Sequence, residues 1–282
     1  MNPAIELRAG ALRLAVRPNI GGTVAGLWHR DTPILRSSEP SSLGQVRAAA
    51  MYPLIPYSNR LGYRRFRWKG RDYITEPNFD DSPHSLHGVG WKRAWRIVSS
   101  SAVEIVLALS HEGDADWPFA FEAHQYFSLE PGSLGVRMQL VNTSTGDQPV
   151  GLGWHPYFVA RTRSRLHAEV SHRWDTDATR LPTRKVAQPG IDGDLSHFDF
   201  DNCFEGWRGP ARIRDERFSL QLTSSLDYLV VYNPPGRDYF CVEPVSHVSN
   251  AIHMAEPSAH GLVVAAPGET VEAWMKLEVA VV

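Results

Sequence analysis

The chain has 282 residues, of which 43% are hydrophobic and 21% are charged, and its formal net charge at pH 7 is -2. This composition is typical of a globular protein with a sizeable core, and it lacks the basic excess that marks nucleic-acid-binding proteins. The sequence has no basic amino-terminal segment followed by a long apolar run and no apolar stretch of bilayer length, so we expect neither a signal peptide nor a membrane partner.

Short segments in which apolar and polar residues alternate recur along the chain. The clearest are residues 12–17, 103–109, 134–142 and 271–282. A period of two is the pattern of half-buried strands. Between two such segments, Pro131 and Gly132 predict the tip of a hairpin. The segment 176–196 is rich in Asp, Gly, Pro and Thr and is predicted to be a long loop.

The same pattern predicts the fold class and the number of domains. There is no sustained 3.6-residue stripe and no alternation of strands with long helices, which disfavours a doubly wound α/β fold. Strand signals run from residue 5 to residue 282 without a linker-like break. We therefore predict one all-β domain over residues 1–282, a large antiparallel β-sandwich or barrel-like pair of sheets.

Two polar residues lie in segments that prolines and glycines interrupt. Arg60 lies in PLIPYSNRLGYRRF (53–66), and His87 lies in SLHGVGW (85–91), where two glycines follow it. Glycines beside a histidine allow close approach of backbone or ligand. The alternative interpretations are a surface salt bridge for Arg60 and a turn histidine bonded to a carbonyl for His87.

A histidine also lies between aromatic residues in GLGWHPYF (151–158). Pro156 favours an extended conformation for His155, so its side chain and that of Trp154 point to opposite faces of a strand. If the strand borders a cleft, His155 could exchange a proton with a ligand. The alternative is a core histidine whose ring nitrogens are both hydrogen-bonded.

A carboxylate follows an apolar run near the carboxyl end. Glu243 comes after Tyr239 to Val242 and precedes Pro244. A carboxylate at the end of a buried strand is costly unless it is paired or used. A glutamate in such a place could have a raised pKa and act as a general base.

Several other chemistries have no support in the sequence. Twelve histidines are present, but no HExxH or His-x-His pair occurs, and we expect no metal site. There is no P-loop, no GxGxxG after a strand and no GxSxG, so we expect no nucleotide cofactor and no serine nucleophile. Cys203 and Cys241 form no CxxC pair, and a cytoplasmic location is expected.

Six segments, taken in order, resemble the aldose 1-epimerase family, also called mutarotases. They are PLIPYSNRLG (53–62), SLHGVGW (85–91), WPF (117–119), GLGWHPYF (151–158), DNCFEGW (201–207) and VEPVSH (242–247). The resemblance runs from about Tyr52 to about Asn250. It implies a β-sandwich of the galactose-mutarotase type, a small-molecule sugar as substrate, no cofactor, and a monomer or homodimer.

The resemblance also implies roles for individual residues. In this family the histidine of HPYF is the general acid, here His155, and the glutamate of EP is the general base, here Glu243. Arg60 and His87 would contact sugar hydroxyls. Asp201 is the best match to an aspartate that also binds hydroxyls, with Asp199 as the alternative.

Two departures from the family pattern and two other functions stay open. The sequence after Glu243-Pro244 and the WPF tripeptide differ from the better-known galactose enzymes, which leaves sugar preference open. A hexose-6-phosphate 1-epimerase would need cationic residues for the phosphate, for which Arg64, Arg65 and Arg93 are candidates. A non-catalytic carbohydrate-binding protein on the same fold is the third reading. Trp91 or Trp154 could pack against a sugar face.

Overall fold

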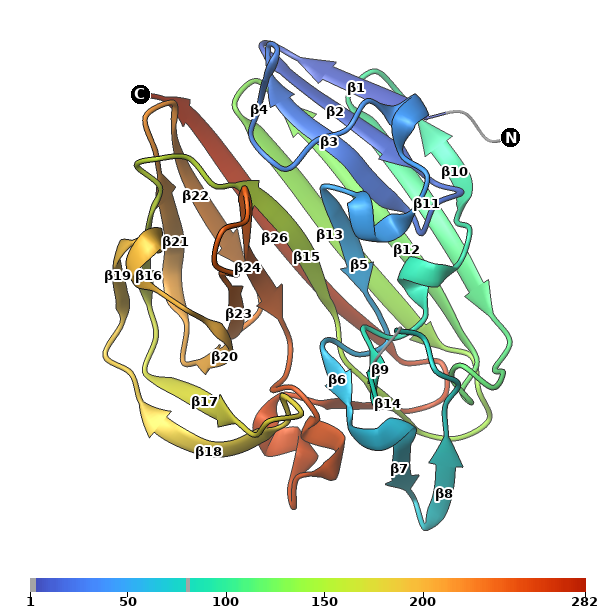
Figure 1. Ribbon diagram of the computed structural model, residues 1–282. Helices are drawn as coiled ribbons and strands as arrows, with labels where there is room; N and C mark the ends of the chain where they lie inside the picture. The colour runs from blue at the N-terminus through green and yellow to red at the C-terminus, as the bar shows by residue number, and fades with distance from the viewer. Residues whose placement is uncertain (1–3, 80–81) are drawn as a thin grey trace.

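The protein is built from two large antiparallel sheets, described here for residues 4–79 and 82–282 of a computed structural model (Figure 1). The first sheet has the spatial order β1 (Ile5–Ala9), β2 (Leu12–Arg17), β3 (Thr23–His29), β5 (Met51–Leu54), β15 (Gly153–Val159), β24 (Tyr239–Val245), β23 (Tyr228–Tyr232), β20 (Asp201–Glu205), β17 (His172–Thr176) and β18 (Pro182–Ala187), with β4 (Thr32–Pro33) paired to β3.

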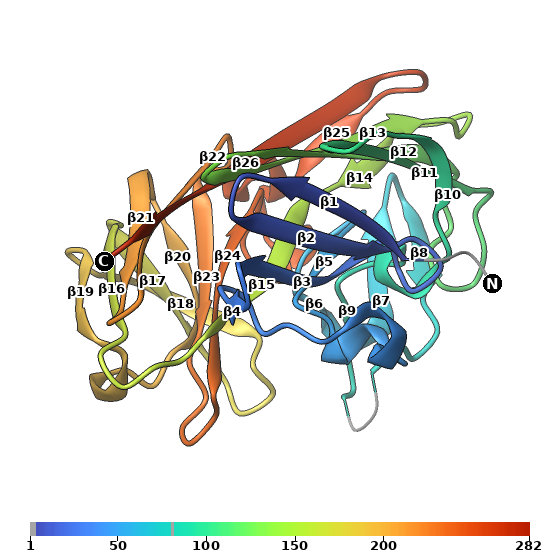
Figure 2. The ribbon, with the colours of Figure 1, turned by 90° about the horizontal axis from the view of Figure 1, so that it is seen from above.

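The second sheet is formed largely by strands from the middle and the carboxyl end of the chain. Its order is β10 (Arg96–Ser100), β11 (Glu104–His111), β12 (Phe121–Glu130), β13 (Ser133–Asn142), β26 (Thr270–Val281), β22 (Phe218–Ser224), β21 (Arg208–Arg214), β16 (Arg165–Glu169) and β19 (Ile191–Asp194). Figure 2 shows β11, β12 and β13 lying over β1, β2 and β3. The strand-rich, two-sheet architecture confirms the predicted all-β sandwich.

The remaining elements are short. They are the strand pairs β6 (Arg60–Leu61) with β9 (Ser85–Leu86), β7 (Arg65–Trp68) with β8 (Arg71–Ile74) and β14 (Gln148–Val150) with β25 (Val263–Ala265), and the 3-10 turns η1 (Pro40–Ser42), η2 (Val46–Ala48), η3 (Gly62–Arg64), η4 (Gly90–Lys92), η5 (Leu195–His197), η6 (Ala251–His253) and η7 (Pro257–His260). Within the described ranges, no helix has the length and apolar character needed to cross a membrane.

The core lies between the two sheets and explains the period of two. In β2 the side chains of Leu12, Leu14 and Val16 are buried in it, and the predicted segments 103–109, 134–142 and 271–282 fall on β11, β13 and β26. Residues 130 and 133 pair across the hairpin between β12 and β13. Pro131 and Gly132 therefore form its two-residue tip, as predicted.

The prediction of a long loop at 176–196 is wrong. This segment contains β18 and β19, which pair with β17 and β16 at the edges of the two sheets. Most side chains of β18 and β19 are partly or fully exposed. Because edge strands in contact with water do not require alternating hydrophobic residues, the period-two pattern is absent there.

Candidate active site

The register of the first sheet brings distant segments of the chain together on the face turned away from the core. Tyr52 of β5 pairs with His155 of β15, and continuing the register from Gly153–Val245 to Tyr157–Cys241 places His155 opposite Glu243 of β24. Because side chains alternate between the faces of a strand, Trp154 points into the core while His155 points out of it. The motif's histidine is therefore set over a cavity by the strand itself.

A second row of residues crosses the same face beside the first. It runs from Tyr157 to Cys241, then to Tyr232 of β23 and Asp201 of β20. The register thus places Asp201, 42 residues before Glu243 in sequence, two strands away from β24 on the same face. The motifs DNCFEGW and VEPVSH meet because β20, β23 and β24 are adjacent strands.

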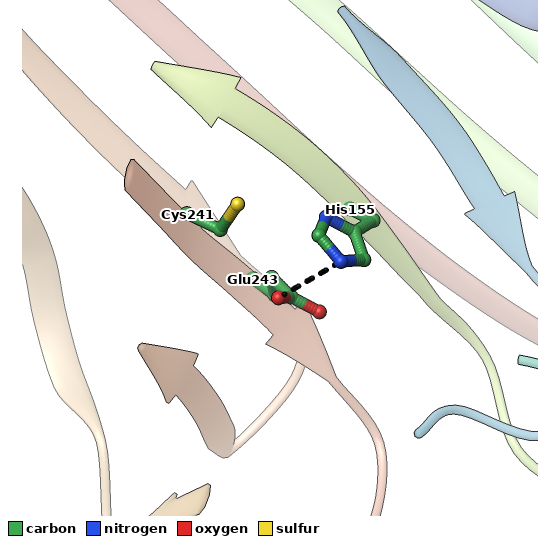
Figure 3. Close-up of side chains that lie close together, drawn as sticks. All are labelled: His155, Cys241 and Glu243. Atoms are coloured by element: carbon green, nitrogen blue, oxygen red, sulfur yellow. Dashed lines mark ion pairs between the residues drawn. The ribbon is translucent and has the colours of Figure 1, made fainter. Parts of the chain in front are cut away.

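His155 and Glu243 form a close, buried pair at the centre of this face (Figure 3). The imidazole Nε2 lies 3.4 Å from a carboxylate oxygen of Glu243. The two residues are only 7% and 2% exposed. Pro156 and Pro244 have no N–H to donate, and each directly follows a member of the pair.

Burial shifts the pKa of both members of the pair. Desolvation raises the pKa of Glu243 well above its usual range, and the Asp201 carboxylate adds to the shift. Desolvation lowers the pKa of His155, with smaller contributions from His87 and Arg36. The pair therefore holds one proton in total over a wide pH range, because the neutral pair and the ion pair contain the same number of protons.

Two tyrosines fix the plane of the His155 ring. The ring of Tyr157 stacks on it with centroids 4.5 Å apart and an interplanar angle of 15°, and Tyr52 lies 4.7 Å away. The hydroxyls of these tyrosines lie 3.3 Å from each other. Within the described residues, no hydrogen-bond partner is found for the buried Nδ1 of His155. Packing, rather than hydrogen bonding, thus orients this ring.

Arg60 is the first residue of β6 and follows the loop after β5. Asn59 adopts a positive φ of 57°, and its side-chain oxygen accepts hydrogen bonds from the backbone N–H and the guanidinium of Arg60. Asparagine tolerates this left-handed conformation better than most residues. Arg60 is directed toward Asp201, with 3.8 Å between Nη2 and a carboxylate oxygen.

His87 approaches the His155–Glu243 pair from the short loop between β9 and η4. Its ring centroid lies 5.3 Å from that of His155. Its Nδ1 accepts a hydrogen bond from the backbone N–H of Asn59, so its Nε2 carries the proton in the neutral ring. Burial, aided by Arg60, lowers the pKa of His87 to about 3. The residue is therefore a neutral donor.

Gly88 allows this close approach of the loop to the sheet. It has a φ of +68°, and a Cβ at this position would lie 2.1 Å from the carbonyl oxygen of Ile55. The glycine after His87 is thus required by both its backbone conformation and its contacts.

The structure separates the two aspartates left open by the sequence. Asp201 borders the cavity and lies within 4 Å of both Arg60 and Arg180. Asp199 lies before β20 and borders a different hollow, together with Arg161 and Arg237. Asp201 is therefore the aspartate that shares a site with His155 and Glu243.

The cavity above the pair has a volume of about 250 Å³, slightly below the roughly 300–1,000 Å³ of small-molecule sites. All five residues predicted from the sequence line it. Its other lining residues are Arg36, Arg47, Tyr52, Asn59, Phe79, Leu86, Tyr157, Val230, Tyr232 and Tyr239. The structure thus brings the predicted residues together in one small, largely polar and aromatic pocket.

Several residues in this cavity could not be singled out from the sequence. Arg36 stacks on the ring of Tyr157, with 3.8 Å from Cζ to the ring centroid, and donates to the carbonyls of Arg47 and Ala49. Nothing in its sequence context marks it. Tyr157 could have been found, because it lies two residues after His155 and therefore on the same face of β15.

Other sequence-based candidates lie elsewhere. Trp154 is fully buried in the core, and the indole N–H of Trp91 is shared by two backbone carbonyls. Arg93 is paired with Asp114 and Asp116. Neither these residues nor Arg64 and Arg65 are among those that line the cavity. The structure therefore does not place either tryptophan, or the three arginines considered for a phosphate, on the wall of this cavity.

Another histidine of the motifs, His247 in VEPVSH (242–247), has a different setting. Its Nε2 accepts from the backbone N–H of Ser58, and its Nδ1 bonds the carbonyl of Val248. Burial lowers its pKa to about 4. Gly151 permits this packing, since a Cβ there would lie 2.1 Å from the His247 ring. His247 thus ties the loop that carries Arg60 to the sheet.

A larger hollow of about 570 Å³ lies on the second sheet, between β11, β12, β13 and β26. It is bordered by Tyr126, Arg137 and Trp274, and Arg137 is paired with the exposed Glu272. None of the predicted site residues borders this hollow. The chemistry-bearing residues therefore belong to the smaller cavity.

Comparison with known proteins gives consistent matches. The family model for aldose 1-epimerase matches residues 3–278. The chain is 31% identical to YphB of Escherichia coli (strain K12), described as uncharacterized, over 97% of each chain. A crystal structure from E. coli K12, described as a candidate aldose 1-epimerase, is 30% identical and superposes with a TM-score of 0.90 over 99% of both chains. At the level of fold alone, galactose 1-epimerase from Lactobacillus acidophilus NCFM superposes with a TM-score of 0.80 at 14% identity, over 99% of this chain and 94% of that one.

Proposed function

The chain belongs to the aldose 1-epimerase family, and we propose that it interconverts the α and β anomers of an aldose by acid–base ring opening and closure. The observation that carries this proposal is the buried pair of His155 and Glu243, 3.4 Å apart at the floor of a small polar cavity. Arg60, His87 and Asp201 around it offer two donors and an acceptor for hydroxyl groups.

The reaction requires two proton transfers at neighbouring atoms. One proton leaves the anomeric hydroxyl and one reaches the ring oxygen, and both oxygens are bonded to C1. An acid and a base that serve them must therefore lie side by side, as His155 and Glu243 do. In the proposed mechanism, the Glu243 carboxylate accepts the hydroxyl proton while the His155 imidazolium donates to the ring oxygen. The C1–C2 bond then rotates, and the roles reverse as the ring closes.

The electrostatics of the pocket disfavour the ion pair that begins ring opening and favour the neutral pair that ends it. Ring opening converts the pair from carboxylate and imidazolium to carboxylic acid and imidazole. Burial favours these two neutral forms, because it raises the pKa of Glu243 and lowers that of His155. The pocket thus favours the protonation state of the open-chain complex. During rotation, Arg60 and Asp201 hold the hydroxyls of the open chain.

Polarimetry tests the proposal. Freshly dissolved α-glucose and α-galactose, followed by a panel of other aldoses, should mutarotate faster with the protein than without it. The proposal fails if no aldose in the panel responds. Binding of a sugar by calorimetry without faster anomer exchange would instead support a non-catalytic carbohydrate-binding protein.

A phosphorylated aldose is a second candidate substrate. Arg36 and Arg47 border the cavity in addition to Arg60, and guanidinium groups bind phosphate oxygens well. Comparison of the rates with glucose and glucose 6-phosphate separates the two. A higher kcat/KM for the phosphorylated sugar, reduced by an Arg36→Gln substitution, would favour the hexose-6-phosphate 1-epimerase.

A further inference from the structure

Cys241 is a third potential metal ligand at the His155–Glu243 pair. It lies two residues before Glu243 on β24, so both side chains emerge on the same face of the sheet. One ligand atom from each of His155, Cys241 and Glu243 lies within 4.8 Å of the other two. Figure 3 shows the thiol beside the imidazole and carboxylate, on the side of the sheet where the pair lies. The acid–base mechanism makes no use of this sulfur.

The spacing of the pair fits a tetrahedral ion. Zinc bonds of about 2.0–2.2 Å to nitrogen and oxygen place two such ligands roughly 3.3 Å apart at a tetrahedral angle. The observed separation between His155 Nε2 and the Glu243 oxygen is 3.4 Å. A Zn–S bond of about 2.3 Å places sulfur roughly 3.6 Å from the other ligands. Because the three ligand atoms lie within 4.8 Å of one another, the thiol needs to move inward by about 1 Å at most.

The chemistry of the three ligands selects a zinc-like ion. Thiolate and imidazole favour Zn²⁺ over Mg²⁺ or Ca²⁺, which take oxygen ligands. A neutral imidazole, a carboxylate and a thiolate give a Zn²⁺ complex with no net charge, so burial does not oppose it as it would an isolated ion. His155 and Glu243 border the cavity, so an ion bound to both of them would be reached from it.

We propose that His155, Cys241 and Glu243 bind Zn²⁺ or another thiophilic divalent cation at the floor of the cavity, and that this ion inhibits the epimerase. Binding occupies the nitrogen that donates the proton and the carboxylate that accepts it. Inhibition, unlike metal binding itself, rests on the proposed function. The ion also competes with the sugar for the same space.

Absorption spectroscopy with Co²⁺ tests the binding without any activity measurement. Co²⁺ is a coloured substitute for Zn²⁺, and a thiolate ligand produces an intense sulfur-to-metal charge-transfer band in the near ultraviolet. The intact chain should show this band at one Co²⁺ per chain, and Zn²⁺ should abolish it by displacement. Absence of the band in the intact chain would overturn the proposal.

Two matched cysteine variants assign the ligand. Cys203 is also buried and free, but it is not part of the three-residue group. The band should disappear in Cys241→Ser and in Cys241→Ala, and persist in Cys203→Ser. A band that survives both Cys241 substitutions or is lost only with Cys203 would contradict the assignment. Thermal unfolding of each variant checks that it is folded.

Inhibition is measured on each variant relative to its own metal-free rate. Zn²⁺ should inhibit the intact chain and Cys203→Ser competitively with the sugar, and Mg²⁺ should not inhibit either. The Zn²⁺ concentration for half-inhibition should rise in Cys241→Ser by at least about tenfold, because loss of even an outer-shell partner costs about 10- to 100-fold in metal affinity. Activation by Zn²⁺, or equal inhibition of Cys203→Ser and Cys241→Ser, would contradict the proposal. If no aldose is a substrate, the Co²⁺ band still decides whether the ion binds.

Discussion

Two of the buried histidines, His155 and His247, lie in adjoining regions and differ in what their ring nitrogens contact. Both ring nitrogens of His247 are hydrogen-bonded to the backbone: Nε2 lies 3.0 Å from the nitrogen of Ser58, and Nδ1 lies 2.7 Å from the carbonyl oxygen of Val248. His155 has a carboxylate 3.4 Å from Nε2, the stacked ring of Tyr157 and the tilted ring of Tyr52 beside it. Both are almost fully buried. Burial alone therefore does not distinguish a structural from a chemical histidine, whereas the partners of the nitrogens do.

The cost of burial differs in the same way. Around His247 the hydrogen bonds offset desolvation and hold the loop against the sheet. At the pair, the raised pKa of Glu243 and the lowered pKa of His155 show that neither charge is fully compensated. A region that is electrostatically strained in this way is expected to favour activity at the expense of stability.

The largest effect is expected at Glu243. Replacement by Gln keeps the shape but removes the base, so kcat should fall by about 10²- to 10⁴-fold. The free energy of unfolding should stay the same or rise, because a carboxyl group that burial disfavours is removed. Polarimetry and thermal unfolding measure the two quantities. Full activity in Glu243→Gln would exclude Glu243 as the base.

Matched alanine substitutions at the two histidines test the comparison itself. His247→Ala leaves the N–H of Ser58 and the carbonyl of Val248 unpaired, which should lower the free energy of unfolding by about 1–3 kcal/mol. His155→Ala should reduce kcat far more than His247→Ala does and destabilise the fold less. Chemical denaturation and steady-state kinetics of both variants provide the measurement. The distinction collapses if the two variants lose activity and stability in parallel.

A smaller effect is expected at Asp201. Replacement by Asn removes a charged acceptor that faces Arg60, and a charge-assisted hydrogen bond of about 1.5–3 kcal/mol corresponds to at least a roughly tenfold rise in KM. Asp199→Asn is the matched control, because Asp199 borders another hollow. A rise in KM with Asp199→Asn and none with Asp201→Asn would reassign the hydroxyl contact.

The pH dependence of the rate should show the smallest change. The pair is active while it holds one proton, and it gains a second when His155 is protonated beside neutral Glu243. Since the pKa of His155 is lowered, kcat/KM should stay high below the ordinary imidazole pKa of about 6.5. A fall in kcat/KM on acidification that has its midpoint at or above about pH 6.5 would contradict the lowered pKa of His155.

The free energy of unfolding, unlike kcat/KM, should decrease as the pH falls below about 6.5. The pKa values of His87 and His247 are lowered to about 3 and about 4. Below the unfolded value of about 6.5, the unfolded chain binds protons that the folded chain does not, so stability decreases as the pH falls toward those values. Each histidine contributes at most about 1.4 kcal/mol per pH unit. His247→Ala should flatten this dependence when unfolding is measured between pH 4 and pH 6.5.

The sandwich can be predicted from the sequence because apolar and polar residues alternate along its central strands. The strands β18 and β19 could not be predicted, because exposed edge strands do not require this alternation. Because side chains two residues apart on a strand share a face, the sequence could also have placed Tyr157 beside His155 and Cys241 beside Glu243. Arg36 could not be predicted, since it reaches the cavity through the bridge of Leu35 to Phe158 of β15 and its stacking on Tyr157. Strand order, which alternation does not encode, decides which segments share the site.

The central claim is that His155 and Glu243 act as one acid–base unit. It is tested most directly by the anomer exchange rate of the intact chain, His155→Gln, Glu243→Gln and the double variant, measured by NMR on the best substrate at equilibrium. Residues that act as a unit are not additive, so the double variant should be about as slow as the slower single variant. A double variant that is slower by the product of the two single effects would show that the residues act independently and would contradict the account.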